Sequence, residues 1–340
     1  MKVLVTGNLG YIGSVLTDVL AAAGFDVTGL DAGFFKDVRF VERGHEVTQL
    51  LKDVRDVEPS DIRGFDAVIH LAALSNDPAG DLNPALTYAI NRDASIRLAQ
   101  LSRKEGVQRF LFSSSCSIYG AHDDKPVAES APFSPLTPYA VSKVDSEREI
   151  SRLAAPGFAP VFLRNATVHG VAPKMRFDLV VNNMAGYAFT EGEIKMLSDG
   201  TPWRPVIHVR DVCGAFVAAL EAPLDTISNQ AFNIGSQQEN FQIKEIAAIV
   251  ASVFKVDVVC LNQNPDDKRS YRVDFSRAYK ELKFRPKWTV EKSARELKAT
   301  FEEHGLSPED FQSDSYMTVK RYKRLLAERQ VSPDLRWLHG

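Results

Sequence analysis

The stretch that decides the fold is Gly7-Asn8-Leu9-Gly10-Tyr11-Ile12-Gly13, a GxxGxxG sequence that directly follows the apolar run Val3–Val5. An apolar strand, a glycine turn and a helix in this order are typical of the first unit of a nucleotide-binding parallel sheet. Glycines let the backbone approach a diphosphate, whose charge then faces the free N–H groups of the helix N-terminus. The alternative is a tight turn that binds no ligand, and the other motifs of the chain are needed to choose between the two interpretations.

Short apolar runs alternate with amphipathic stretches through the first half of the chain. This alternation predicts parallel strands covered by helices on both faces, which is an α/β fold with a doubly wound Rossmann sheet. The expected strands are residues 3–5, 27–30, 47–50, 67–71, 110–112 and 161–163. Apolar residues at helical spacing predict helices over 12–23, 84–104 and 138–153, the last two opened by prolines that a first turn tolerates.

Composition limits the class of protein. With 340 residues, of which 44% are hydrophobic, the chain can bury a large core. Its formal net charge of -3 gives no overall attraction to nucleic acid or to an anionic membrane, so neither is an expected partner. Cys116, Cys213 and Cys260 lack the spacing of a zinc site or a disulfide framework, and no metal is expected. No signal peptide or membrane-spanning stretch is recognisable, which predicts a cytoplasmic protein.

An acidic residue indicates which dinucleotide the glycine turn accepts. The second expected strand is followed by Asp31, about 20 residues beyond the turn, where a carboxylate binds both ribose hydroxyls and repels a 2′-phosphate. NAD is therefore expected rather than NADP, with a helix N-cap as the alternative role for Asp31. Asp53 and Val54 are placed at the adenine edge, although Asp53 also suits a solvated turn. The small residues of Leu71-Ala72-Ala73 would let a cofactor lie against the backbone.

Tyr139 and Lys143 are four residues apart and therefore share one face of a helical turn. A tyrosine hydroxyl has an ordinary pKa of ~10, too high for a base near neutrality. An ammonium within about 4–6 Å lowers that pKa, and a positive nicotinamide ring lowers it further. Tyr139 is thus expected to accept a substrate proton, with Ser115 holding the same oxygen. YxxxK alone is a common chance pattern, but its place after the glycine turn and the serine cluster 113–115 favours catalysis.

Together these segments resemble the nucleotide-sugar epimerase/dehydratase family of extended short-chain dehydrogenases/reductases. The likeness spans roughly residues 1–290 and rests on Thr6-Gly7-x-x-Gly10-Tyr11-Ile12-Gly13, Asp31, Asp53-Val54-Arg55-Asp56, His70-Leu71-Ala72-Ala73, Asn91, Ser113-Ser114-Ser115-x-x-Ile118-Tyr119-Gly120 and Tyr139-x-x-x-Lys143. It implies that Ser115, Tyr139 and Lys143, with NAD, oxidise a sugar hydroxyl, usually at C4, to a ketone. The implied cofactor contacts are Gly7, Gly10, Tyr11, Ile12, Gly13, Asp31, Asp53, Val54, Leu71, Ala72, Ala73, Asn91, Tyr139 and Lys143.

The regular alternation ends near residue 165, which predicts a second, smaller lobe of mixed α/β structure. The NAD-binding domain is expected over 1–174, with 203–240 returning to it, and the substrate lobe with the C-terminal helices over 175–202 and 241–340. Segment 199–212 resembles the family stretch whose arginine, here Arg204, clamps the substrate diphosphate. The expected contacts to a nucleotide-diphosphate sugar are Ser75, Asn76, Ser115, Cys116, Ser117, Asn183, Arg204 and Arg269, with Arg272 as the alternative to Arg269 and a surface charge as the alternative for each arginine.

Departures from the family pattern bear on the reaction. Family 4,6-dehydratases place an acidic pair where this chain has Cys116-Ser117, so that reaction is disfavoured. Cys116 or Ser117 could serve as an acid/base in a 3- or 5-epimerisation, but a free cysteine beside a strand is more often plain packing. The segments 164–170 and 174–179 resemble a branch that includes GDP-heptose C4 dehydrogenases.

Three functions follow from this pattern. The first is a nucleotide-sugar epimerase, the second a C4 dehydrogenase or reductase with net redox change, and the third a non-catalytic NAD-sensing module. The intact Ser115, Tyr139 and Lys143 argue against the third. The helices 84–104 and 138–153 resemble the family's dimer helices, so the resemblance also implies a homodimer.

Overall fold

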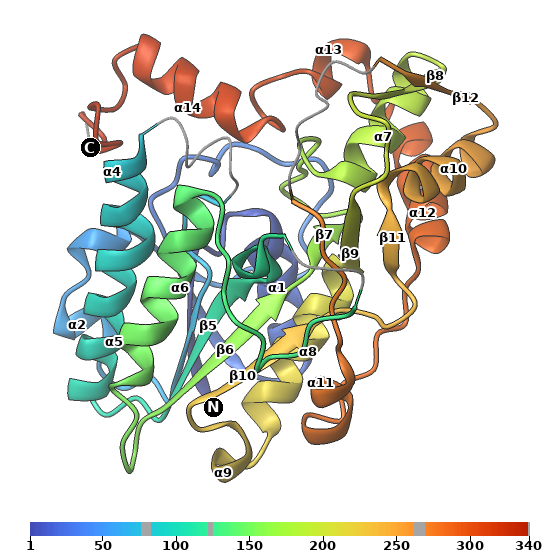
Figure 1. The fold of residues 1–340 in the computed structure, drawn as a ribbon. Helices are drawn as coiled ribbons and strands as arrows, with labels where there is room; N and C mark the ends of the chain where they lie inside the picture. Colours follow the sequence, from blue (N-terminus) through green and yellow to red (C-terminus); the bar gives the residue numbers. More distant parts are fainter. Residues whose placement is uncertain (76–82, 122–124, 262–268, 339–340) are drawn as a thin grey trace.

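The computed structural model describes residues 1–75, 83–121, 125–261 and 269–338. Its centre is a seven-stranded sheet of order β10-β6-β5-β4-β1-β2-β3, in which all neighbours are parallel (Figure 1). The strands are β1 (Lys2–Thr6), β2 (Asp26–Asp31), β3 (Thr48–Leu51), β4 (Ala67–His70), β5 (Arg109–Ser115), β6 (Ala159–Asn165) and β10 (Gln230–Ile234). The doubly wound Rossmann sheet expected from the sequence is confirmed.

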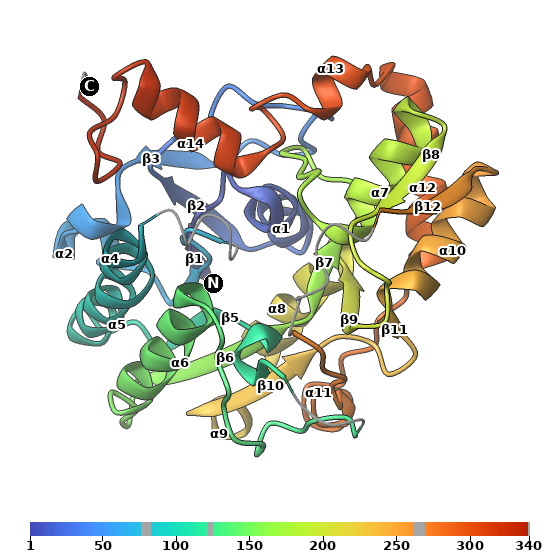
Figure 2. The ribbon, with the colours of Figure 1, turned by 45° about the horizontal axis from the view of Figure 1, so that its top comes forward.

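Helices cover the two faces of this sheet because successive strand residues point to opposite sides. Val3 and Val5 of β1 belong to one buried cluster and Leu4 to another. Helices α1 (Tyr11–Ala22) and α8 (Val209–Glu221) pack together on one face, and α4 (Pro84–Thr87), α5 (Ala94–Lys104) and α6 (Pro138–Ser151) cover the other (Figure 2). Between α4 and α5 a π-helical section, η2 (Tyr88–Asp93), interrupts the helix expected over 84–104. Such sections are frequent at functional sites.

The second lobe is built on two small sheets. One contains β7 (Thr167–His169), β9 (Trp203–His208) and β11 (Asn240–Gln242), and the other pairs β8 (Glu193–Met196) with β12 (Asp257–Cys260). Its main helices are α7 (Val180–Thr190), α10 (Ile243–Phe254) and α12 (Val290–His304). The remaining helical elements of the chain, which are distributed over both lobes, are η1 (Val54–Asp56), α2 (Pro59–Ile62), η3 (Cys116–Tyr119), α9 (Leu224–Ile227), α11 (Ser276–Glu281), α13 (Pro308–Phe311) and α14 (Thr318–Ala327).

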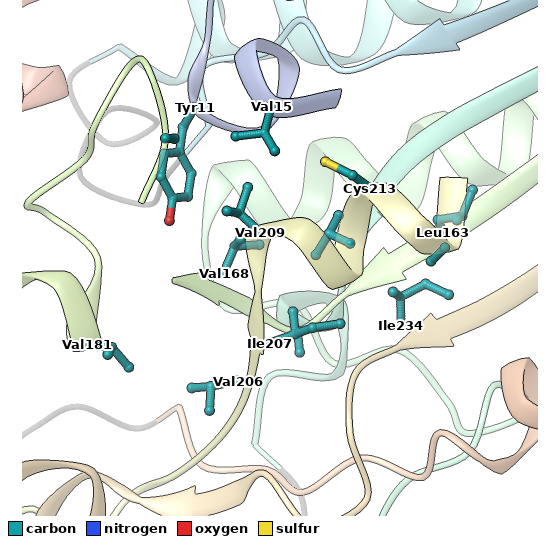
Figure 3. Close-up of a cluster of buried hydrophobic side chains, with 14 of the residues drawn as sticks. Tyr11, Val15, Leu163, Val168, Val181, Val206, Ile207, Val209, Cys213 and Ile234 are labelled. Carbon is teal, nitrogen blue, oxygen red and sulfur yellow. The ribbon is translucent and has the colours of Figure 1, made fainter. Parts of the chain in front are cut away.

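Apolar side chains of both lobes meet in one continuous core (Figure 3). It extends from α1 through α8 to β9 and α7, and its members include Tyr11, Val15, Val209, Cys213, Ile207, Val206 and Val181. Burial of this shared apolar surface holds the second lobe against the edge of the sheet where strands β1, β5 and β6 end. The two lobes therefore meet at the carboxyl ends of the parallel strands, which is where open α/β sheets bind ligands.

The C-terminal part departs from the expected division of the chain. Helix α14 packs on the first lobe, where Tyr322 and Leu325 join the cluster of Leu4, Leu30 and Phe35. Strand β10 lies in the central sheet, whereas β9 lies in the second lobe's sheet. We keep the two-lobe division as a proposal, with α14 assigned to the first lobe on these contacts.

A buried ion pair fastens α6 to the sheet. Arg164 of β6 binds Glu147 of α6 through two nitrogens, at 2.7 Å for Nη2 to Oε2 and 3.0 Å for Nε to Oε1. The side chains are only 6% and 5% exposed. Tyr119 accepts a further hydrogen bond from Arg164 Nη1 at 3.0 Å.

Replacing Arg164 by alanine should lower the free energy of unfolding by about 3–5 kcal/mol, because it leaves a buried carboxylate without its partner. Urea unfolding followed by circular dichroism measures this. The control is Arg152→Ala, whose arginine is 70% exposed and pairs with Glu149 at the surface; it should cost less than about 1 kcal/mol. Equal losses for the two variants would contradict the role assigned to the buried pair.

Candidate active site

The glycine turn has no room for side chains at two positions. Gly7 has a φ of +77°, and a Cβ there would lie 2.7 Å from the backbone nitrogen of Ala72. A Cβ on Gly13 would lie 2.2 Å from the Gly7 carbonyl oxygen. Gly10, the N-cap residue of α1, has no side chain to accept hydrogen bonds from the first-turn N–H groups. The turn therefore exposes a bare backbone and a helix N-terminus, which suit a dinucleotide diphosphate.

Asp31 lies directly beside this turn, at the end of β2. Its Oδ2 accepts a hydrogen bond from the Leu9 N–H at 3.1 Å and its Oδ1 one from the Gly33 N–H at 2.8 Å. Burial raises the pKa of Asp31, and these two bonds and the nearby Arg43 oppose that rise. The carboxylate thus stands next to the turn at the place that the ribose of NAD requires, so these residues fit the cofactor.

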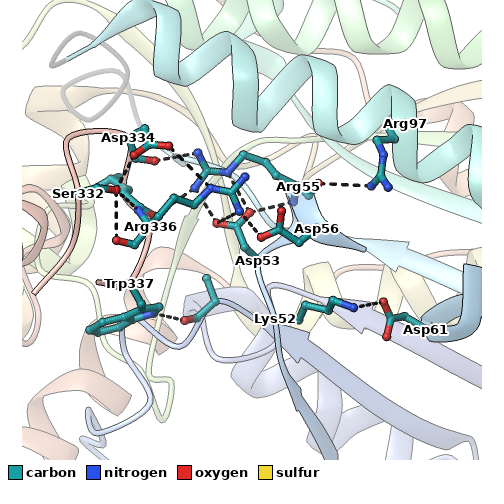
Figure 4. A network of polar contacts seen from close by, with 12 residues as sticks. Lys52, Asp53, Arg55, Asp56, Asp61, Arg97, Ser332, Asp334, Arg336 and Trp337 are labelled. Carbon is teal, nitrogen blue, oxygen red and sulfur yellow. Dashed lines mark hydrogen bonds and ion pairs between the residues drawn. The ribbon is translucent and has the colours of Figure 1, made fainter. Parts of the chain in front are cut away.

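The segment that contains the predicted adenine contacts, Asp53 and Val54, is held by the C-terminal tail, because Arg55 donates hydrogen bonds to the carbonyls of Asp334 and Leu335. Asp53 binds Arg55 through both carboxylate oxygens, at 2.9 Å and 2.7 Å. Arg336 pairs with Asp56, and the Trp337 indole N–H donates to Ala32 O at 2.6 Å (Figure 4). No local pattern predicts the contact between Asp56 and Arg336, which are 280 residues apart. The adenine roles of Asp53 and of the buried Val54 stay predictions.

Other predicted cofactor residues have side chains that fix the backbone around the site. Asn91, in η2, accepts from the Leu74 N–H at 2.8 Å and donates to Leu74 O at 3.0 Å, which holds the segment after β4. Tyr11 is buried and donates to Gly170 O at 2.7 Å, tying α1 to the second lobe. Ile12 packs against the shared core. Leu71, Ala72 and Ala73 follow β4 beside the glycine turn and are partly exposed.

Local sequence brings the catalytic candidates to the end of β5. Thr137 caps α6 by accepting from the Ala140 N–H at 3.2 Å, and Pro138 occupies the first turn. This fixes where the helix begins, and therefore which side chains face the sheet. Ser115 is the last residue of β5, and helix α6 packs on this strand.

Lys143 is buried beneath Tyr139. Its ammonium lies 5.7 Å from the Tyr139 ring centroid and donates to Ser113 O at 2.7 Å. Burial lowers the pKa of Lys143 to about 7, partly opposed by Glu147 one helical turn on. Tyr139 and Ser115 remain partly exposed, and the Ser115 Oγ accepts a hydrogen bond from the Ser117 N–H at 3.1 Å. The structure therefore places Tyr139 and Lys143 together as the spacing predicted.

The residues after Ser115 differ in environment. Cys116 is buried and its Sγ donates to Arg164 O at 3.1 Å, and burial raises the pKa of this thiol far above its ordinary value. A thiol held in this way suits packing better than proton transfer. The Ser117 Oγ is buried and has no hydrogen-bond partner among the described residues.

Arg176 is a site residue that the sequence analysis did not single out. Its Nη1 lies 3.1 Å from the Ser75 Oγ, and its Nε and Nη2 both bind Asp178 at 2.9 Å. It is also near enough to Tyr139 for their charges to interact. The only signal in the sequence was that Arg176 lies within the segment 174–179, which resembles the branch that includes GDP-heptose C4 dehydrogenases. Asn76 lies outside the described residues.

The predicted diphosphate clamp forms where β9 meets residues 269–273. Arg204 is 8% exposed, and its Nη1 donates to Trp203 O at 2.8 Å and to Arg269 O. The alternative cation, Arg272, lies over the Trp203 ring, 4.8 Å from its centroid. Asn183 is placed on α7 and donates to Phe177 O at 2.9 Å. The structure thus brings the two arginine segments together, while their contacts to substrate stay predictions.

No group of three or more His, Cys, Asp or Glu side chains within the described residues is arranged to hold a metal ion. In the part of the chain that the structure describes, no helix has both the length and the apolar character to cross a membrane. The cytoplasmic location expected from the sequence stays a prediction.

Residues 3–235 match the NAD dependent epimerase/dehydratase family. The chain belongs to this family. This confirms the resemblance drawn from the motifs, and with it an NAD-dependent enzyme. Among the relatives, UDP-glucose 4-epimerase 1 of Oryza sativa subsp. japonica is 30% identical over 328 residues, covering 87% of this chain and 93% of that protein. The UDP-glucose 4-epimerase of Lactobacillus helveticus is 31% identical over 280 residues, covering 74% and 82%.

Solved structures of epimerase/dehydratase proteins have the same fold. The UDP-N-acetylglucosamine 4-epimerase of Methanobrevibacter ruminantium M1, in complex with UDP-N-acetylmuramic acid, superposes with a TM-score of 0.78 at 26% identity, over 89% of this chain and 98% of that one. MoeE5 with UDP-glucuronic acid and NAD gives a TM-score of 0.79 at 24% identity, over 89% and 99%. The second likeness concerns the fold alone.

Replacing Gly7 by alanine should destabilise the protein by about 2–5 kcal/mol, because backbone strain adds to the clash with Ala72. NAD affinity, measured by calorimetry, should fall as well. The control is Gly24→Ala, which has a similar φ of +82° but no atom within 4 Å of the new Cβ. It should cost only about 1–2 kcal/mol and leave NAD affinity unchanged. Unaltered NAD binding in the Gly7 variant would count against a diphosphate at this turn.

Proposed function

We propose that this chain is a nucleotide-sugar epimerase that oxidises a sugar hydroxyl, at C4, to a transient ketone and reduces it again on the other face. The observation that carries the proposal is the pairing of a partly exposed Tyr139 with the buried ammonium of Lys143, beside Ser115. The relatives that are named UDP-glucose 4-epimerases, at 30% and 31% identity, support this reaction class.

Tyr139 is the base in this proposal. Bound NAD supplies the acceptor and donor of hydride. The Lys143 ammonium, 5.7 Å from the phenol ring, favours the phenolate because an adjacent positive charge stabilises the negative form. Tyr139 takes the hydroxyl proton during oxidation and returns it during reduction. Ser115 hydrogen-bonds the same substrate oxygen and keeps it in line with Tyr139.

The second lobe binds the diphosphate half of the substrate in this account. Arg204 is almost fully buried and two backbone carbonyls hold its Nη1, so little side-chain entropy is lost when the guanidinium contacts a phosphate. Arg269 and Asn183 lie in the segments next to it. Anchoring through the diphosphate would leave the sugar free to turn, which epimerisation requires.

The second candidate is a C4 dehydrogenase or reductase with net redox change. It is kept because segments 164–170 and 174–179 resemble the branch that includes GDP-heptose C4 dehydrogenases, and Arg176 of the second segment lies 3.1 Å from the Oγ of Ser75, a predicted substrate contact. Absorbance at 340 nm separates the two: an epimerase yields an isomer without accumulating NADH, and a dehydrogenase accumulates it. An NAD-sensing module would yield neither.

Replacing Tyr139 by phenylalanine should lower turnover by about 10²–10⁴-fold, the usual range for loss of a general acid/base. NAD affinity should change little, because the phenol ring remains. Product isomers are measured by chromatography after incubation with a nucleotide sugar. Tyr187→Phe, on α7 of the second lobe, is the matched control and should keep full activity. Unchanged turnover in the Tyr139 variant would rule out this mechanism.

We further propose a homodimer through the helices that carry η2, α5 and α6, which pack side by side on one face of the sheet (Figure 2). Sedimentation equilibrium should then give twice the 37.7 kDa chain mass at micromolar concentration. Ile96→Arg, on α5, should shift the protein to monomers, whereas Leu261→Arg, exposed on the other lobe, should not. A monomeric unaltered protein would refute the proposal.

A further inference from the structure

Lys174 is a buried cation that the proposed reaction does not use. It lies between β7 and α7, and only 2% of its surface is exposed. Its ammonium contacts the face of Phe35, 4.0 Å from the ring centroid. Among the described residues, no carboxylate lies within ion-pair distance of this ammonium.

The charges around Lys174 do not compensate its burial. Arg176 and Arg321 both disfavour the ammonium form, and Asp178 favours it from a distance. Both Asp178 oxygens, however, are bound by Arg176 at 2.9 Å. Desolvation is the largest cause that lowers the pKa of Lys174, to about 7. A buried cation without an anionic partner is costly, and contact with an aromatic face offsets only part of that cost.

The position of Lys174 relates it to the cofactor site. Its backbone N–H donates to the Ser14 Oγ, in the first turn of α1, at 3.3 Å. Phe35 follows β2, four residues beyond Asp31. The backbone of Lys174 therefore lies at the uncapped N-terminus of α1. Its ammonium lies at the loop that follows Asp31, the predicted ribose-binding carboxylate. In a Rossmann fold the diphosphate of the dinucleotide lies at the first of these segments and its adenosine ribose lies at the second.

Helix α14 closes this region from outside. Tyr322 packs on Phe35 with ring centroids 5.9 Å apart, and burial together with the nearby Asp31 carboxylate raises the pKa of its hydroxyl. Arg321 donates to Phe34 O at 2.9 Å and pairs with Asp37. Helix α14 thus fastens the loop whose Phe35 ring covers the Lys174 ammonium.

We propose that Lys174 binds the diphosphate of NAD and supplies the positive charge that the uncapped N-terminus of α1 alone lacks. The anionic diphosphate is then the partner that the buried ammonium requires, and the low dielectric around it strengthens the attraction. The inference rests on NAD binding by this family and not on the proposed epimerase reaction.

Lys174→Met, which keeps the apolar stem, tests the proposal by calorimetry with ADP and adenosine as probes at pH 6, below the pKa of about 7 of Lys174, where its ammonium form prevails. ADP affinity should fall about 10- to 100-fold, the value of a charge-assisted hydrogen bond, while adenosine affinity stays within about twofold. Lys174→Gln should behave in the same way, and Lys174→Arg should retain most of the ADP affinity. Lys323→Met, on the exposed side of α14, is the matched control and should change neither affinity.

Thermal unfolding of the ligand-free protein separates this role from a structural one. Removing an unsatisfied buried charge should leave the Tm of Lys174→Met unchanged or raise it, although the stabilisation by added NAD shrinks. ADP affinity equal to that of the unaltered protein, or a parallel loss of adenosine affinity, would overturn the proposal. Because both readouts measure binding, failure of the epimerase reaction alone would not affect them.

Discussion

The Lys143 ammonium is held where little water reaches it, 2.7 Å from Ser113 O and below the ring of Tyr139. Its burial depends on the close packing of α6 on β5, and that packing depends on the Glu147–Arg164 pair one turn further along the helix. In the proposed mechanism, the ammonium that favours the Tyr139 phenolate is therefore carried by a helix that a buried ion pair ties to the sheet. Without this support, the partly exposed Tyr139 would be an ordinary phenol near the end of a strand.

The same principle, a buried charge placed by the fold, recurs around the cofactor site. Asp31 is desolvated at the end of β2, and Lys174 is desolvated under the loop that follows it. Attraction between a ligand and such a preorganised group needs little rearrangement, because the desolvation has already taken place during folding.

Much of this arrangement is readable from the sequence because its signals are local. The GxxGxxG turn, the carboxylate after β2 and the Tyr139–Lys143 spacing each lie within one strand-turn-helix unit, whose geometry neighbouring residues determine. The surroundings of Asp53 and Arg176, in contrast, could not be predicted from local sequence. Arg55, which binds Asp53, is itself held by the Asp334 carbonyl of the C-terminal tail, and Arg176 is bound to Ser75, a hundred residues earlier. Contacts of this kind depend on how the lobes pack, and no local pattern encodes them.

The central claim is that one site removes hydride from C4 and returns it to the opposite face. Turnover of a nucleotide sugar deuterated at C4, followed by mass spectrometry of the epimer, tests that claim most directly. The account predicts that the deuterium stays on the product at C4, because it is carried by the bound cofactor and never exchanges with water. Loss of the label to solvent, or its accumulation in released NADH, would contradict it.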